Sequence, residues 1–426
     1  MIPRFVFCLF FVIFLGLGCI TSEPEAEVVL VPYSDLEEQL SSILEEESLM
    51  GLSVAVVHEN KLAYTQGFGW ADLGRKIPMT AESIVRVASI SKSVAATALM
   101  MLYEQGKCQL DEDIGKYLGF SVRNPHFPDV PITLRMIMSH TASIQDGEGY
   151  EAFLGDMRSK HLAIAALFEE KGAYYTADMF MNHYPGTYFT YSNASWGLLA
   201  SVIESISGER FDVFCRRHIF IPLEMDASFN VADIIAIAQL AVLYRYEDQQ
   251  WIAQFDNYGG QIPAQEDLSW YTSGHNGLYF GPQGGLRCSA VDLAKFMLLH
   301  INEGVYKGQR LLKASTIQQM HAEEWLYTEE NGNTSGDFMF SWGLGFHRLT
   351  RRDSTDILFP DRDMLGHPGK AYGLVSDMYF DPESKSGVIF ITNGSQYPYK
   401  YGLESTFYRP EEKVFDVIYR YVMGGE

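Results

Sequence analysis

The chain has 426 residues, of which 47% are hydrophobic and 20% charged, a composition typical of a folded protein and not of a disordered one. This length is enough for a large core in one elaborated domain or in two closely packed ones. The formal net charge of -22 disfavours nucleic acid and anionic membrane surfaces as partners, although an acidic surface also serves solubility alone.

Residues 1–18 are predicted to be a signal peptide. Their apolar stretch, residues 5–17, is too short for a comfortable membrane span and suits a signal-peptide core. The sequence GLGC at residues 16–19 resembles the lipobox of bacterial lipoproteins, although Leu usually stands in place of the first Gly. We therefore expect export to the periplasm or cell envelope with a lipid anchor on Cys19, which would be the chain's only link to a membrane. The alternatives are a plain cleaved signal and an uncleaved anchor. Residues 19–34 are expected to form an acidic, extended tether.

A domain over residues 35–426 is expected to follow, with a sheet built by both ends of the chain. In its first part, Ser34 and Glu37 have the spacing of a capping box before a helix over residues 35–48. The apolar runs 52–57 and 62–68 then predict a β-hairpin. A helix that carries Ser89 follows and ends near Gly106.

The rest of the chain favours a mainly helical insertion and a return to strands. Residues 106–284 are rich in helical patterns and in loops of Pro, Gly, Tyr and Asn. The later predicted elements are a capped helix starting at Ser289 and Asp292, strands at residues 343–349, 373–380 and 388–392, and a final helix at 411–423. We therefore expect an α/β fold of the α+β type, in which residues of about 35–105 and 285–426 form an antiparallel sheet flanked by helices.

The strongest chemical signal is a single charge in an apolar helix. Lys92 is the only charged residue of segment 87–102, and a buried ammonium is costly unless it is used. Ser89 precedes it by three residues, which places both on one helix face. This is the Ser-x-x-Lys arrangement of a serine nucleophile activated by an amine, and it occurs once in the chain. Free N–H groups at a helix start also favour developing negative charge.

A second candidate element is Tyr191-Ser192-Asn193, the only Tyr-x-Asn of the chain. The Tyr191 phenol can move protons, and the Asn193 amide can hold a substrate carbonyl. The alternative for this pair is a buried tyrosine next to a capping asparagine.

A third element should be a cation, any residue and then Gly, on a strand beside the pocket. His275-Asn276-Gly277, His367-Pro368-Gly369 and Lys385-Ser386-Gly387 all have this form. Lys385 reads as the tip of a hairpin that faces water, and His275 lies in a loop without a strand pattern. We favour His367, because the glycines of its segment permit close approach of the backbone to a substrate.

These residues, with the blocks LRMIMSHTASI, PGTYFTYSN, GGLRCSAVDLAKFM and GHPG, give the chain a family resemblance. Over about residues 35–422 it resembles the serine β-lactamase and penicillin-binding-protein superfamily, in particular its branch of class C β-lactamases, DD-peptidases and esterases. The resemblance implies a β-lactamase/transpeptidase-like fold without a cofactor. It also implies acyl transfer to Ser89, with Lys92 and Tyr191 handling the proton and either of them as the base.

The resemblance also assigns the substrate-binding groups. Backbone N–H groups of Ser89 and of Lys370, which follows Gly369, would hold the oxyanion. Asn193 would position the substrate amide, and His367 would face the leaving-group side or a substrate carboxylate.

Departures from the family pattern indicate the substrate class. The β-lactamases of this branch have Lys where His367 stands, and Pro368 lacks the hydroxyl and N–H of the usual residue. Both changes favour an esterase or a D-amino-acid peptidase over an antibiotic-hydrolysing β-lactamase. His140 lies in the block SHTAS, which also departs from the usual pattern, and we interpret it as structural.

Two further features have competing interpretations. The aromatic segments 174–191 and 251–280 either wall a pocket for an apolar acyl or aryl group or, as we favour, pack the helical region. The cysteines that remain after Cys19, namely Cys108, Cys215 and Cys288, give no disulfide framework and no metal-site spacing, so we expect no metal. The competing function is a catalytically silent lipoprotein that binds peptidoglycan or acts as a scaffold. The complete set of Ser89, Lys92 and Tyr191 argues against it.

Overall fold

The computed structural model describes residues 33–352, 355–396 and 399–424. The chain divides into two units, Met1–Pro32 and Tyr33–Glu426. The predicted signal peptide, Cys19 and the tether up to residue 32 lie outside the described residues. Within those ranges, no helix combines the length and the apolar character needed to cross a membrane.

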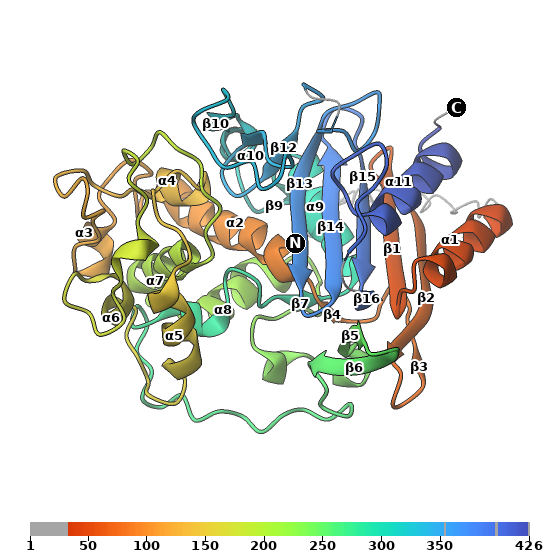
Figure 1. Ribbon diagram of the computed structural model, residues 1–426, viewed down its shortest axis with the longest axis horizontal. Coiled ribbons are helices and arrows are strands. Elements are labelled where there is room, and N and C mark those ends of the chain that lie inside the picture. The colour runs from red at the N-terminus through yellow and green to blue at the C-terminus, as the bar shows by residue number, and fades with distance from the viewer. Residues whose placement is uncertain (1–32, 353–354, 397–398, 425–426) are drawn as a thin grey trace, which may run out of the picture. The chain divides into compact units, whose positions relative to one another are not determined.

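The second unit is built on an antiparallel sheet to which both ends of the chain contribute, as predicted (Figure 1). Strand β1 pairs with β2 on one side and with β15 on the other, so that Val54 lies opposite Phe390. The strand order is β10-β11-β12-β13-β14-β15-β1-β2-β3. The strands are β1 (Gly51–His58), β2 (Lys61–Asp72), β3 (Ile77–Pro78), β10 (Trp325–Leu326), β11 (Ser341–Trp342), β12 (His347–Leu349), β13 (Met364–Ala371), β14 (Leu374–Asp381) and β15 (Ser386–Thr392).

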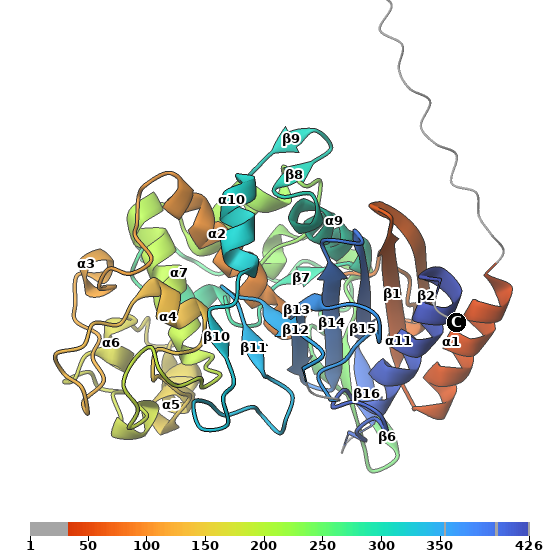
Figure 2. The ribbon, with the colours of Figure 1, turned by 90° about the horizontal axis from the view of Figure 1, so that it is seen from above.

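Helices cover both faces of this sheet (Figure 2). Helices α1 (Ser34–Glu46) and α11 (Arg409–Val422) pack on one face, and α2 (Ser91–Glu104) and α9 (Ala290–Ile301) lie on the other. The side chains of β1 therefore point alternately to the two faces of the sheet. Val54 and Val56 pack in the core under α1 and α11, and Ala55 and Val57 pack in the core on the other face. Burial on both faces explains the unbroken apolar run of β1.

The predicted hairpin between β1 and β2 is confirmed. Its two loop residues, Glu59 and Asn60, both have positive φ angles of 48° and 67°, the geometry that the shortest hairpin turns require. The capping box of α9 is also confirmed, since the Ser289 hydroxyl accepts from the Asp292 N–H.

Two local predictions are wrong. Ser34 and Glu37 form no capping box, because α1 begins one residue earlier, at Ser34, with Tyr33 as its N-cap. The Tyr33 ring packs edge-on against Tyr64 at 5.1 Å and anchors this end of the helix instead. The strand predicted over residues 343–349 is shorter, because Gly345, with φ of 78°, turns the chain between β11 and β12.

The region between the two parts of the sheet holds mostly short helices. They are α3 (Gly115–Leu118), α4 (Leu134–Met138), α5 (Glu148–Asp156), α6 (Ala165–Phe168), α7 (Ala194–Ser207) and α8 (Phe211–Cys215). It also contains a hairpin that the sequence analysis missed, β5 (Leu243–Glu247) and β6 (Gln250–Phe255), which pairs with β16 (Gly394–Gln396) in a second sheet.

The remaining elements are short. They are strands β4 (Val85–Arg86), β7 (Arg287–Cys288), β8 (Val305–Tyr306) and β9 (Gln309–Arg310), helix α10 (Ala314–His321), and the helical turns η1 (Ala88–Ile90), η2 (Ala177–Met179), η3 (Arg216–Phe220), η4 (Val231–Asp233), η5 (Ile237–Gln239) and η6 (Gly277–Phe280). Turn η1 lies against β13 and leads directly into α2, so the segment of Ser89 is held between the sheet and the helical region.

Candidate active site

Ser89 lies in the turn η1 that precedes helix α2. The residue before it, Ala88, has a φ angle of 46°, a left-handed conformation that is costly for a residue with a side chain. The Ser91 hydroxyl stabilises this turn, because it donates to the Ala88 carbonyl at 2.6 Å and accepts from the Leu286 N–H at 3.0 Å. The sharp turn leaves Ser89 half-buried on the wall of a cavity.

The Lys92 ammonium is buried directly beneath Ser89. The Lys92 side chain is fully buried, and its Nζ lies 3.1 Å from Ser89 Oγ. Two further oxygens surround it, Asn193 Oδ1 at 2.8 Å and the Gln283 carbonyl at 2.7 Å. Burial lowers the pKa of Lys92 to about 7, although the nearby Asp146 carboxylate acts in the opposite direction. Near neutral pH a substantial fraction of this amine is therefore uncharged.

Asp146, which the sequence analysis did not identify, orients Asn193. Its Oδ2 accepts from Asn193 Nδ2 at 2.7 Å, and its Oδ1 accepts from the backbone N–H groups of Asn193 and Ala194 at 2.8 Å each. A carboxylate only accepts, so this contact turns the NH₂ of Asn193 away from Lys92 and its amide oxygen towards it. The same contacts satisfy backbone donors at the start of α7.

The Tyr191 side chain closes the other side of the nucleophile. Lys92 Nζ lies 4.8 Å from the centre of the Tyr191 ring, and the Tyr191 hydroxyl interacts with the Ser89 side chain. Burial raises the pKa of Tyr191, so its phenol is neutral at pH 7. His140 stacks on this ring at 4.4 Å, and its Nδ1 accepts the Ser192 N–H, a position that fits the structural role expected for it.

His367 lies close to this group, but it does not reach the cavity. Its side chain on β13 is fully buried, with its ring 5.3 Å from that of Trp342 and 6.1 Å from that of Tyr191. Alternation along β13 places His367 on one sheet face and Pro368 and Lys370 on the other. The prediction that His367 faces the leaving-group side or a substrate carboxylate therefore needs correction, because the residues of this part of β13 that line the cavity are Pro368, Gly369 and Lys370.

The backbone of β13 approaches the nucleophile at Gly369. A Cβ atom at this position would come within 2.7 Å of the Val87 carbonyl and 3.2 Å of the Ser89 nitrogen. Glycine is therefore needed to bring the strand against the amide of Ser89, next to Lys370. This is the neighbourhood in which the sequence analysis expects the oxyanion site.

The cavity at Ser89 has a volume of about 320 Å³. Besides Ser89, Tyr191 and Asn193 it is lined by Ser335, Gly336, Phe338, Met339, Pro368, Gly369, Lys370, Val375, Tyr401, Thr406, Phe407, Tyr408 and Glu411. Its aromatic walls therefore come mostly from the C-terminal part of the chain, and the aromatic segments considered in the sequence analysis contribute only Tyr191.

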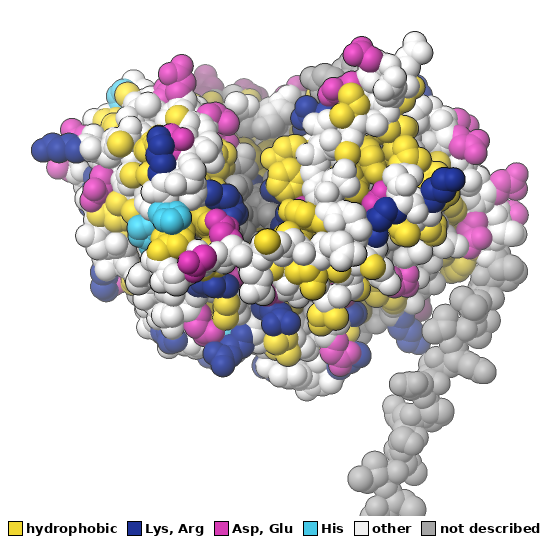
Figure 3. All heavy atoms as spheres, turned by 90° about the horizontal axis from the view of Figure 1, so that it is seen from below, with side chains coloured by type: hydrophobic (Ala, Val, Ile, Leu, Met, Phe, Trp, Pro, Cys, Tyr) yellow, Lys and Arg dark blue, Asp and Glu magenta, His cyan; other side chains and the backbone are white. Residues whose placement is uncertain are grey.

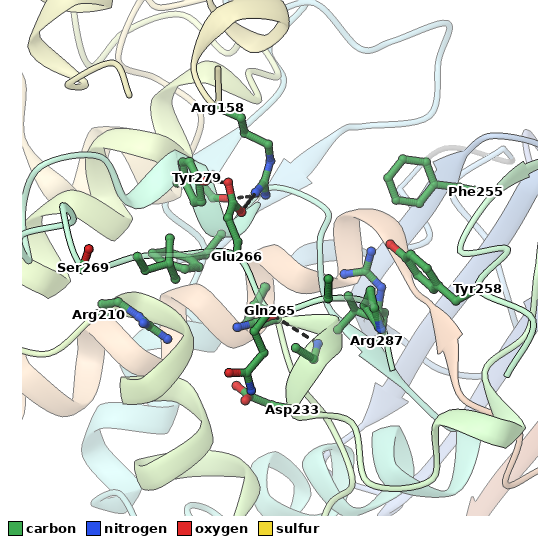
Figure 4. Close-up of a pocket in the computed structure, with 18 residues that line it drawn as sticks. Arg158, Arg210, Asp233, Phe255, Tyr258, Gln265, Glu266, Ser269, Tyr279 and Arg287 are labelled. Atoms are coloured by element: carbon green, nitrogen blue, oxygen red, sulfur yellow. Dashed lines mark hydrogen bonds and ion pairs between the residues drawn. The ribbon is translucent and has the colours of Figure 1, made fainter. Parts of the chain in front are cut away.

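A larger cavity, of about 670 Å³, shares no lining residue with the first (Figure 4). The second aromatic segment contributes Tyr258, Tyr279 and Phe280 to it. Its three arginines are already paired with carboxylates, Arg158 with Glu266, Arg210 with Asp212 and Arg287 with Asp256. In a view from below, the surface of this unit is hollowed between its helical side and its sheet side (Figure 3).

The described residues include no group of three or more His, Cys, Asp or Glu side chains arranged to hold a metal ion. Cys108, Cys215 and Cys288 are buried free thiols.

Comparisons with known proteins agree with the fold. The family model described as Beta-lactamase matches residues 36–404. The penicillin-binding protein PbpX of Bacillus subtilis is 28% identical over 339 residues, which cover 79% of this chain and 72% of the relative. Among solved structures, the hydrolase EstCE1 matches with a TM-score of 0.67 and 22% identity, over 91% of this chain and 99% of that one. A D-amino acid amidase of Ochrobactrum anthropi matches with a TM-score of 0.60 and 21% identity, over 91% and 99%.

Proposed function

Because the chain belongs to the β-lactamase family of serine hydrolases, we propose that it forms an acyl-enzyme on Ser89 and cleaves an ester or amide bond. The observation that carries this proposal is the environment of Lys92, whose amine lies 3.1 Å from Ser89 Oγ in a fully buried position. A buried amine of lowered pKa beside a hydroxyl can accept the proton that the serine loses when it attacks a carbonyl.

The contacts of Lys92 favour this direction of proton transfer. Neither Asn193 Oδ1 nor the Gln283 carbonyl oxygen carries a hydrogen, so each must accept from the amine. A neutral amine has two N–H groups, and these two acceptors use both. Its lone pair is then left for the third contact, the Ser89 hydroxyl, which donates to it. The uncharged Lys92 is thereby oriented as a base.

Tyr191 fits the complementary role of a proton donor. Its raised pKa keeps the phenol protonated at pH 7, where Lys92 is already partly neutral. We infer that Lys92 takes the proton of Ser89 and that Tyr191, whose hydroxyl interacts with Ser89, gives its proton to the leaving group. The proton held by Lys92 then returns to Tyr191, so that acylation leaves both groups in their starting states. The N–H groups of Ser89 and Lys370 would stabilise the oxyanion beside Gly369.

The cavity supports an ester or a D-amino-acid amide as substrate. The apolar and aromatic side chains of Phe338, Val375 and Phe407 suit a hydrocarbon or aryl group on the substrate. Two structural relatives, a hydrolase with promiscuous acyltransferase activity and a D-amino acid amidase, act by chemistry of the same class. The buried, neutral His367 offers no cation for the carboxylate of a β-lactam, and Lys370, which does line the cavity, donates to the Tyr408 hydroxyl.

Covalent labelling tests the nucleophile. A fluorophosphonate probe is expected to form one adduct, which peptide mass mapping places on Ser89, and p-nitrophenyl esters are expected to be hydrolysed with a burst. A folded protein that carries no adduct on Ser89 with either a fluorophosphonate or a fluorescent penicillin would instead support the silent binding module.

Alanine substitutions distinguish His367 from Lys385 as the residue of the third motif. His367→Ala is expected to lower kcat about tenfold with little change in KM, because the ring packs behind Tyr191 and contacts no cavity space. Lys385→Ala should leave both constants unchanged, since this side chain is exposed in the turn between β14 and β15. Steady-state kinetics with one p-nitrophenyl ester is the measurement. If Lys385→Ala lowers kcat and His367→Ala does not, the third motif is Lys385-Ser386-Gly387 instead of His367-Pro368-Gly369.

A further inference from the structure

Two buried carboxyl groups lie side by side near the catalytic cavity, and one of them, Glu411, lines it. Asp377, on β14, is fully buried, and neither of its carboxylate oxygens receives a hydrogen bond from a donor among the described residues. Glu411, on the first turn of α11, is only 3% exposed and lines the cavity that contains Ser89. A buried carboxylate without a donor is costly, which makes Asp377, packed beside Glu411, an unusual polar feature near the nucleophile.

The carboxyl groups of Asp377 and Glu411 interact directly. They lie within hydrogen-bonding reach of each other, and burial raises the pKa of both. Each of two carboxyl groups in contact disfavours the ionisation of the other, so near neutral pH the pair keeps at least one proton and carries at most one negative charge. One oxygen of Glu411 already accepts the Tyr408 N–H at 2.6 Å. Glu411 is the member of the pair that lines the cavity, so its second oxygen is the acceptor that a group in the cavity meets first, with Asp377 buried behind it.

The nearest cation, Lys370, lowers the pKa of Glu411 by its charge, but this effect is smaller than that of burial and the two groups form no ion pair. Lys370 extends from the same face of the sheet, but its Nζ donates to the Tyr408 hydroxyl and lies 5.4 Å and 5.1 Å from the ring centres of Tyr399 and Tyr408. Among the described residues, no ion pair joins Lys370 to Asp377 or Glu411. An ammonium group brought by a ligand would supply the missing donors and a full positive charge.

We propose that the carboxyl pair Asp377–Glu411 binds the ammonium group of a cationic substrate whose ester or amide carbonyl lies at Ser89. This proposal rests on the proposed function and adds a substrate class to it. The wall between the two ends is apolar and aromatic at Phe338, Val375 and Phe407, so the substrate would carry its ammonium group on a hydrocarbon or aryl spacer. The same charge would repel a substrate carboxylate at this position.

Equilibrium binding to the Ser89→Ala variant tests this subsite without any turnover. Isothermal titration calorimetry would compare phenylalkylammonium ions that have one to four methylene groups with the matched phenylalkanols. At the best spacer length we expect the ammonium ion to bind at least about tenfold more tightly than its alcohol, because hydrogen bonds to charged groups are the stronger ones.

Three additional substitutions in the Ser89→Ala background locate the effect. Glu411→Gln should reduce the preference to about twofold or less, and glutamine can still accept the Tyr408 N–H that begins α11. Asp377→Asn should act in the same direction. The matched control is Asp416→Asn, which removes an exposed carboxylate of the same helix and should keep the full preference. Thermal melting of each variant reports whether its fold is retained.

Two results would overturn the subsite. One is equal or undetectable binding of the ammonium ions and the alcohols, and the other is a preference that survives both Glu411→Gln and Asp377→Asn. If the ammonium preference is found but Ser89 of the unmodified protein carries no fluorophosphonate adduct, then the proposed hydrolase function fails while the binding subsite stands.

Discussion

Ser89→Ala is expected to abolish turnover while leaving the fold intact. Removing the nucleophile should lower kcat by about 10⁴-fold or more, since the members of such a catalytic group act as a unit and single deletions are nearly as damaging as a combined one. The melting temperature should hardly change, because Ser89 is half-buried at a cavity wall and no backbone group in the turn depends on its hydroxyl. Hydrolysis of p-nitrophenyl esters and thermal melting of one sample give both readouts.

Ser91→Ala is the matched control for this variant. Its hydroxyl lies in the same turn but supports the Ala88 carbonyl and the Leu286 N–H. Its loss should cost about 1–3 kcal/mol of unfolding free energy, because it leaves buried backbone groups unsatisfied, while Ser89 can still be labelled. The two variants should therefore show opposite patterns of stability and labelling. Retention of most activity in Ser89→Ala would refute the assignment of the nucleophile.

The sequence predicts the parts of the site that depend on local geometry. Ser89 and Lys92 are one helical turn apart, so their contact follows from spacing alone. The sheet made by both ends of the chain follows from alternating and apolar runs whose period is a local property. The hairpin β1–β2 was predictable for the same reason, because its loop is only two residues long.

The orientation of His367 needed the tertiary structure. Alternation along β13 separates His367 from Lys370, but the sequence does not say which sheet face meets the cavity. That choice is made by α11, which brings Glu411 over the face of Lys370. The pattern cation-x-Gly identifies the strand, and the packing of a helix more than 40 residues later decides which side chain contacts the substrate.

Asp146 and Asp377 lay beyond sequence reasoning for a different reason. The chain contains 54 acidic residues, so the sequence around a single one does not show that it has a functional role. Asp146 acquires its role only because the N-terminus of α7 is brought against it, and Asp377 only because Glu411 closes over it. Both roles depend on contacts between segments that are distant in the chain, and a single sequence does not contain them.

Lys92→Met should abolish acylation near neutral pH and stabilise the protein. In the unmodified enzyme only the neutral amine acts as a base, so the rate of acylation should rise about tenfold per pH unit below pH 7 and level off above the pKa of Lys92, about 7. Methionine has a similar length but no lone pair to offer Ser89. The acylation burst can be measured by stopped flow from pH 5 to pH 9. In the variant, this burst should lose both its amplitude and its pH dependence.

The stability of the same variant tests the cause of the lowered pKa. Because the pKa of Lys92 is lower in the folded chain than the usual lysine value of about 10.4, the unfolded state binds more protons between about pH 7 and pH 10. This group therefore makes the unmodified protein more stable as the pH rises through that window, and it is most destabilising below pH 7, where the buried amine is charged. Lys92→Met has no such charge, so its melting temperature should exceed that of the unmodified protein most at pH 6 and by less at pH 9. A variant that is less stable at pH 6 would mean that the hydrogen bonds of Lys92 to Asn193 and Gln283 outweigh the cost of burying its charge.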